Sequence, residues 1–266
     1  MMPRLMLRWH IATIVLSLLI SLNPTNMTAQ AIFHSASSRG HADHGWLNTY
    51  HSFSFASWHN PERMHFGALR VLNDDQVAAG RGFGRHPHDN MEIISIPLSG
   101  DLRHADSMGN ETVIREGDVQ IMSAGTGVVH SEFNHSEEEE VRFLQIWIYP
   151  EMRDLAPSYD QKHFPPSEQL NTWQNIVRPA SSSGEGVAIH QNAWLHLGRY
   201  GSGATPTYRA QRPGNGVYVF VLEGKANIEG QELERRDAIG IDSNREFRVE
   251  CTEDSRILLL DVPMQW

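Results

Sequence analysis

The stretch EIISIPLSGDLRHAD (92–106), followed by GDVQIMSAG (117–125), decides the fold of this chain. It consists of short runs rich in β-forming residues, and each run is bounded by glycine, asparagine or aspartate at a turn. A weaker copy of the pattern returns as VYVFVLEGKANIEG (217–230) and RDAIGIDSN (236–244). Such runs are typical of strands in a β-sandwich or barrel, and their repetition predicts two copies of one unit.

The remaining sequence from Phe66 onward has the same strand-like character. Further runs of this kind are FGALRVLN (66–73), VRFLQIWIYP (141–150) and SRILLLDV (255–262). No long stretch has the period of a helix, apart from single turns near residues 167–174. The sequence therefore predicts an all-β protein.

The first residues have the pattern of a secretory signal peptide. Arg4 and Arg8 precede an apolar stretch over 11–22, and Ala29-Gln30-Ala31 supplies the small residues that signal peptidase favours. The apolar stretch is too short for a stable membrane-spanning helix, and an uncleaved anchor is the alternative interpretation. We predict a signal peptide over 1–31, export to the periplasm, and no stable membrane insertion afterwards.

The mature chain is predicted to contain two β domains. The first spans 32–165, a linker spans 166–186, and the second spans 187–266. Pro166, Pro179 and a Ser/Gly run mark the linker, although the Ser/Gly run fits a hairpin loop equally well.

Composition excludes some classes of partner. Without residues 1–31 the chain keeps 20 Lys and Arg against 32 Asp and Glu, a formal charge of −12. Such an acidic protein is a poor candidate for binding nucleic acid or anionic membranes. The single cysteine, Cys251, allows no internal disulfide, so a packed core must supply the stability. We expect Cys251 to be a buried structural thiol.

Two short motifs predict a metal site. His86 and His88 in RGFGRHPHDNMEII, and His130 and Glu132 in MSAGTGVVHSEFN, are each spaced i and i+2. In a strand this spacing puts both side chains on one face, so two neighbouring strands can aim all four groups at one point. Three imidazoles and a carboxylate form a complete ligand set for a first-row transition metal.

The surroundings of the first motif add two expectations. Pro87 cannot donate to a sheet ladder, so its strand belongs at an edge or a barrel mouth. Glu92 also follows the first histidine pair, and spacing alone leaves open whether Glu92 or Glu132 is the carboxylate ligand.

The second copy of the unit lacks such a ligand set. In the matching positions it has Gln211, Arg212, Pro213 and Val249. We therefore expect the second domain to be a structural copy without a metal.

Several motifs of the chain resemble those of the pirin family of bicupins. The resemblance spans the mature chain and is carried by five segments, RGHADHGWLNTYHSFSFA (39–56), HPHDNMEIISIPLSG (86–100), DSMGN (106–110), GDVQIMSAGTGVVHSE (117–132) and LQIWIYP (144–150). It implies two cupin barrels of jelly-roll type, with the metal site in the first. It also implies His86, His88, His130 and Glu132 as the ligands, with Glu92 as a neighbour.

The resemblance further implies a function. Some bacterial pirins act as quercetin 2,3-dioxygenases, so the expected reaction is oxidation of a flavonol-like small molecule by O₂, with Glu132 as the catalytic residue. The expected cofactor is one mononuclear divalent metal, Fe(II) first, with Mn, Ni, Cu or Zn as alternatives. Two other classes stay open: a non-enzymatic metal-binding or redox-sensing protein, and a different cupin activity such as another dioxygenase or an isomerase. We expect a monomer, because a bicupin is complete alone.

Overall fold

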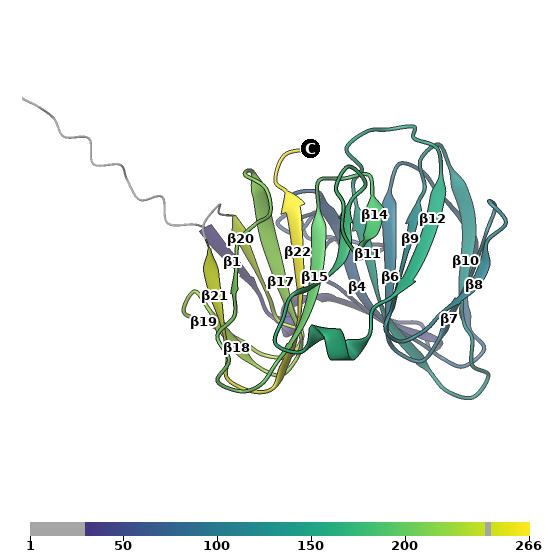
Figure 1. Cartoon of the computed structure of the whole chain (residues 1–266). Coiled ribbons are helices and arrows are strands. Elements are labelled where there is room, and N and C mark those ends of the chain that lie inside the picture. The colour runs from purple at the N-terminus through teal and green to yellow at the C-terminus, as the bar shows by residue number, and fades with distance from the viewer. Residues whose placement is uncertain (1–29, 243–245) are drawn as a thin grey trace, which may run out of the picture.

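The apolar runs of the sequence form strands throughout the part of the chain that the structure describes. The computed structural model describes residues 30–242 and 246–266, which contain 22 strands and two short 3-10 helices, η1 (Ala36–Ser38) and η2 (Pro166–Gln169) (Figure 1). The predicted all-β class is confirmed. Residues 1–29 of the predicted signal peptide lie outside the described residues. Among the described residues, no helix has the length and hydropathy needed to cross a membrane.

The first barrel is built from a seven-stranded and a four-stranded sheet. The large sheet has the order β12-β9-β6-β11-β4-β3-β2 and the small one β5-β10-β7-β8. All neighbouring strands in both sheets are antiparallel. The bounds of these strands are Gly40–Asp43 (β2), Leu47–His51 (β3), Leu69–Val77 (β4), Gly82–His88 (β5), Glu92–Ser99 (β6), Leu102–Asp106 (β7), Glu111–Ile114 (β8), Asp118–Ser123 (β9), Val128–Asn134 (β10), Val141–Ile148 (β11) and Ser158–His163 (β12).

The second barrel repeats this plan. Its large sheet has the order β1-β20-β17-β22-β15-β13-β14 and its small sheet β16-β21-β18-β19. The bounds are Gln30–His34 (β1), Gln174–Pro179 (β13), Val187–Ile189 (β14), Trp194–Tyr200 (β15), Thr207–Tyr208 (β16), Asn215–Glu223 (β17), Ala226–Ile228 (β18), Gln231–Leu233 (β19), Ala238–Asp242 (β20), Phe247–Cys251 (β21) and Ser255–Pro263 (β22).

Two strands bear on where the domains divide. Strand β1 pairs with β20, so the first described residues of the chain extend the sheet of the second barrel. The segment 166–186, expected as a linker, contains η2 and β13, and β13 pairs with β15 of the same sheet. The domain boundaries expected from the sequence stay predictions.

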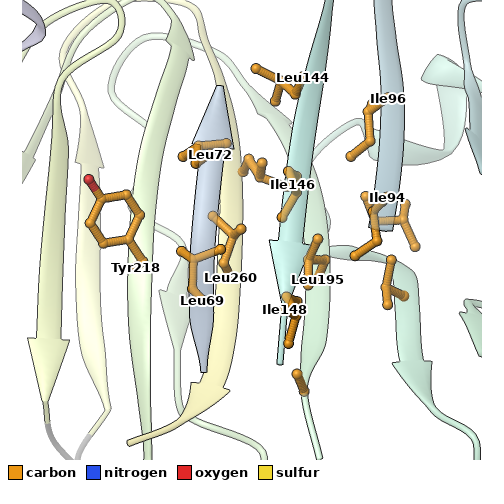
Figure 2. Close-up of a cluster of buried hydrophobic side chains, with 14 of the residues drawn as sticks. Leu69, Leu72, Ile94, Ile96, Leu144, Ile146, Ile148, Leu195, Tyr218 and Leu260 are labelled. Atoms are coloured by element: carbon orange, nitrogen blue, oxygen red, sulfur yellow. The ribbon is translucent and has the colours of Figure 1, made fainter. Parts of the chain in front are cut away.

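The largest apolar core lies between the two large sheets. In β11, Leu144, Ile146 and Ile148 are fully buried in a cluster that also contains Leu195 and Leu260 of the second barrel. Figure 2 shows these side chains between the facing strands. Strand alternation turns the intervening residues of β11 the other way, into the first barrel. Each large sheet therefore has two buried faces, which explains its nearly continuous apolar sequence.

The interiors of the two barrels differ. The second is filled by an apolar cluster that includes Val219, Ile241 and Leu259, together with Cys251, which is 2% exposed as expected for a structural thiol. The first has two smaller apolar clusters. Its interior also contains a polar group of side chains, described next.

Candidate metal centre

Strands β5 and β10 bring the two predicted motifs together. They pair antiparallel, with His130 opposite His86 and Val128 opposite His88. All three histidines lie together on these adjacent strands, as their spacing predicted. Strand β5 is the edge strand of the small sheet, as Pro87 predicted.

A β-bulge adjusts the pairing at the site. Between His130 and Glu132 the register shifts, so that Gly84 and Arg85 on β5 stand opposite one residue of β10. Gly82 lets the strands approach, because a Cβ there would clash with the backbone of β10 at Glu132. Gly82 therefore helps to position β5 against β10.

The three histidine rings form a tight cluster. Their ring centroids lie 4.4 Å apart for His86 and His130, 4.8 Å for His86 and His88, and 4.9 Å for His88 and His130. One nitrogen from each ring lies within 4.8 Å of the others. Nδ1 of His86 is 2.7 Å from the carbonyl oxygen of Gly84, so it donates its hydrogen there and leaves Nε2 with a free lone pair.

His130 shows the strongest sign of a missing ligand. The residue is 1% exposed, and both ring nitrogens are buried without a hydrogen-bond partner among the described residues. Burial, followed by the charges of His86 and His88, lowers the pKa of His130 to about 2. Burial, followed by the charge of His86, lowers the pKa of His88 to about 4. Both rings are therefore neutral at ordinary pH, which is the form that binds a metal.

Glu132 lies deeper in the barrel and is 2% exposed. Ser95 Oγ donates to Oε1 at 2.9 Å, and Gln145 Nε2 donates to Oε2 at 2.7 Å. Burial raises the pKa of Glu132 to about 7. A second group of possible ligand atoms, from His104, His130 and Glu132, also lies within 4.8 Å. His130 therefore joins the histidine cluster to Glu132, and the four-ligand assignment stays a prediction.

His104 is a site residue that the sequence reasoning missed. It lies on β7 opposite Glu132, and its fully buried Nε2 is 3.1 Å from Asp106 Oδ2. Its other nitrogen, Nδ1, is buried with no hydrogen-bond partner among the described residues. The signal was present in LRHAD, where Leu102, His104 and Asp106 alternate onto one face of the strand.

Glu92 points away from this site. It lies on β6, next to Ile93, whose side chain packs inside the first barrel. Alternation therefore directs Glu92 toward the second barrel, where it accepts hydrogen bonds from Ser123 Oγ at 2.6 Å and from the backbone N–H of His190 at 3.2 Å. Glu92 belongs to neither group of possible ligands.

A cavity of about 440 Å³ opens beside the cluster. Its lining combines aromatic side chains with polar groups from β3 and β4. The rings of Trp147 and His88 pack in a T-shaped contact with their centroids 4.9 Å apart. The lining also includes Phe55, Phe83, His51, Thr49, Asn73 and Asp75. Both His86 and Glu132 line this space, so a molecule bound there meets the candidate ligands directly.

The second barrel has a different arrangement in its interior. Tyr208 donates to Asp261 at 2.9 Å, and Asn215 Nδ2 donates to the other oxygen of Asp261 at 2.7 Å. His196 Nδ1 lies 3.2 Å from the Tyr208 hydroxyl. These groups satisfy one another. Within the described residues, both groups of possible metal ligands lie in the first barrel.

Comparison with known proteins gives consistent matches over both barrels. The pirin family model matches residues 32–148, which contain β2 to β11, and the model of the quercetinase C-terminal cupin domain matches 176–262, which contain β14 to β21. A quercetin 2,3-dioxygenase of Escherichia coli (strain K12) is 39% identical over 230 residues, covering 86% of this chain and 96% of that protein. A pirin-like protein of Caulobacter vibrioides is 38% identical over 222 residues, covering 84% and 95%. The crystal structure of the bacterial pirin YhhW from Escherichia coli in complex with nickel(II) has a TM-score of 0.82 and 37% identity, covering 88% of this chain and 99% of that chain.

Proposed function

The chain belongs to the pirin family, as its motifs predicted, and from that premise we propose that it is a metal-dependent dioxygenase acting on a flavonol such as quercetin. The observation that carries the proposal is the cluster of three histidines and a buried carboxylate beside a cavity that is partly lined by aromatic side chains.

The residues of the site fit a divalent transition metal. His86, His88 and His130 would hold it through their ring nitrogens, and Glu132 would supply a carboxylate oxygen. The two unpartnered nitrogens of buried His130 support this assignment, because a buried polar atom without a partner is costly. Fe(II) is our first choice, and Mn, Ni, Cu or Zn suits the same donors. When bound, the metal would polarise the substrate hydroxyl and activate dioxygen.

Glu132 is the residue that we propose to move a proton. A pKa of about 7 is close to the pH at which an enzyme works, which suits a general base. Ser95 and Gln145 fix both carboxylate oxygens, so the acceptor is oriented before the substrate arrives. An oxygen of Glu132 would accept the proton of the flavonol 3-hydroxyl, leaving the enolate that reacts with O₂.

The cavity accounts for the proposed substrate class. Its volume of about 440 Å³ suits one small molecule with several rings. Phe55, Phe83 and Trp147 offer apolar surfaces to a planar ring system, while His51 and Asn73 offer hydrogen bonds to ring hydroxyls. The cavity would also exclude bulk water from the reacting carbons.

Oxygen uptake tests this function. Mature protein is stripped of metal, reloaded with Fe(II), Mn, Ni, Cu or Zn, and supplied with quercetin. We expect metal-dependent O₂ consumption with release of carbon monoxide, and loss of both in Glu132→Gln. Stoichiometric metal without uptake across a flavonoid panel would instead indicate a metal-binding or redox-sensing protein. Turnover without O₂ would indicate a different cupin activity.

We further propose that the protein is an exported periplasmic monomer. The basic and apolar pattern before Ile32 supports export, and the acidic charge of −12 supports a small-molecule substrate over nucleic acid. Cell fractionation and the molar mass of the purified mature protein test both statements.

A further inference from the structure

A second cavity, of about 330 Å³, lies at one end of the large sheet of the second barrel. It shares no lining residue with the cavity at the candidate metal centre. Strands β15, β17 and β22 and the segment after η2 supply its walls, which include Asn171, Arg199, Glu223, Asp254 and Arg256. Nothing in the proposed oxidation uses this space.

Two arginines face each other in this cavity. Arg199 on β15 stands directly opposite Arg256 on β22 in the antiparallel ladder. Strand alternation places both on the same face as Leu197 and Leu258, whose side chains are buried between the two barrels. Like charges directly opposite one another destabilise a sheet unless a counter-charge lies nearby.

The protein supplies little counter-charge for Arg256. This residue is 5% exposed, and its Nε is buried without a hydrogen-bond partner among the described residues. Within the described part of the chain, the guanidinium of Arg256 forms no ion pair. Burial and then the charge of Arg199 lower its pKa, whereas the more distant charges of Glu223 and Glu116 partly oppose this shift without forming an ion pair. A guanidinium stays protonated in either case. A buried, unpaired positive charge of this kind is costly.

The neighbouring acids do not satisfy the two arginines. Glu223 stands opposite Arg256 on β17, yet its side chain is exposed. Asp254 is also exposed, and its Oδ1 accepts a hydrogen bond from the backbone N–H of Ser202 at 2.9 Å. Arg199 makes one long contact, from Nε to Gln169 Oε1 at 3.4 Å.

We propose that this cavity binds a tetrahedral oxyanion, a phosphate group, between Arg199 and Arg256. Each guanidinium presents a planar set of N–H donors that matches the oxygens of a phosphate. One doubly charged group would neutralise both arginines and give Arg256 its missing acceptor. The volume exceeds that of a free phosphate, so the group can be inorganic phosphate or part of a small phosphate monoester.

Calorimetric titration of the mature protein, carrying its metal as isolated, tests the proposal. The probes are inorganic phosphate and glycerol 3-phosphate, at constant ionic strength. We expect saturable binding of one anion per chain. Arg199→Gln and Arg256→Gln should each weaken it about tenfold or more, the usual effect of losing hydrogen bonds to a charged group. Tighter binding of glycerol 3-phosphate would identify a monoester as the source of the group, and tighter binding of phosphate would identify the free ion.

Three further variants complete the design. Arg248→Gln removes an exposed arginine from β21, outside the cavity, and should leave the affinity unchanged. Glu223→Gln removes the nearest competing carboxylate and should strengthen binding several-fold. His88→Ala should bind phosphate normally, which separates this site from any phosphate held by a metal.

Two results would overturn the proposal. One is the absence of saturable binding, and the other is an affinity unchanged by Arg199→Gln. Because Arg199 is only half-buried, that variant should fold even if Arg256→Gln does not.

Discussion

Replacing Glu132 by glutamine in the metal-free protein should reveal how much the buried carboxylate costs. Burial raises the pKa of Glu132 from 4.5 to about 7, a difference that corresponds to about 3 kcal/mol. Glutamine has nearly the same shape and no charge, so it avoids this cost. Its amide offers one acceptor oxygen in place of two, however, so either Ser95 or Gln145 must reorient to accept from the new NH2 group. We expect this rearrangement to destabilise the variant by about 1 kcal/mol, which offsets part of the gain from removing the charge.

The expected effect depends on pH. Below about pH 4.5 the carboxyl is protonated in both the folded and the unfolded state, and burial of the charge costs nothing. Between about pH 4.5 and 7 the unfolded state ionises while the folded state stays protonated, so the wild-type protein loses stability as the pH rises. Above about pH 7 the cost is constant. Glu132→Gln should therefore be nearly neutral at about pH 5 and should stabilise by about 2 kcal/mol at about pH 8.

Chemical denaturation of chelator-treated protein at several pH values measures this difference. Comparing variant with wild type cancels the titration of the histidines, which is common to both. Asp75→Asn is a matched control, since burial also raises the pKa of Asp75 to about 7, and this residue belongs to neither group of possible ligands. Asp75→Asn should likewise stabilise the protein more as the pH rises to about 7, beginning at a lower pH because the ordinary pKa of Asp75 is 3.8, and it should keep the metal.

Two outcomes would refute the reasoning. A stability difference between Glu132→Gln and wild type that does not change with pH would show that the Glu132 charge is not desolvated. A metal-loaded Glu132→Gln protein as stable as metal-loaded wild type would show that this carboxylate does not bind the metal. With the metal bound, we expect wild type to be more stable than Glu132→Gln, because the ionised carboxylate then binds the metal and its charge is neutralised.

Three other substitutions test the remaining parts of the site. His88→Ala should lose the metal and keep its far-ultraviolet circular dichroism, and stoichiometric metal by elemental analysis would contradict the proposed ligands. Glu92→Ala should keep the metal but lose about 1–3 kcal/mol in chemical denaturation, because Ser123 and the His190 N–H lose their acceptor. His104→Phe should lower metal affinity about 10- to 100-fold in chelator competition, as expected for a residue that orients ligands, and an unchanged affinity would assign it to packing alone.

The sequence predicted the histidine cluster because the argument needed only strand alternation. His86 and His88 are spaced i and i+2, and so are His130 and Glu132, so each pair shares a face wherever the strands lie. The all-β class followed in the same way from short apolar runs between turns. Pro87 added the correct expectation that its strand is an edge strand.

Long-range pairing could not be predicted in this way. The choice between Glu92 and Glu132 depends on which face of β6 lines the barrel, and the first six residues of β6 are buried on both faces. His104 joins the site because β7 pairs with β10, a contact between strands that are not consecutive. Likewise, β1 pairs with β20 from the opposite end of the chain. All three features depend on how distant segments pair. The local sequence pattern of a strand does not specify its partner.

The difference between the two barrels arises on the inner faces of equivalent strands. In β11 the inward positions include Gln145 and Trp147, which line the cavity, whereas the inward Leu259 of β22 packs in the apolar core of the second barrel. Because the inner face of its large sheet carries polar side chains, the first barrel has fewer apolar contacts in its interior. The outer face of the same sheet contributes stability instead, since Ile146 and its neighbours pack there against the second barrel (Figure 2). The second barrel thus stabilises the strands that carry Ser95 and Gln145, the hydrogen-bond partners of Glu132, and so supports the candidate metal centre from outside the first barrel.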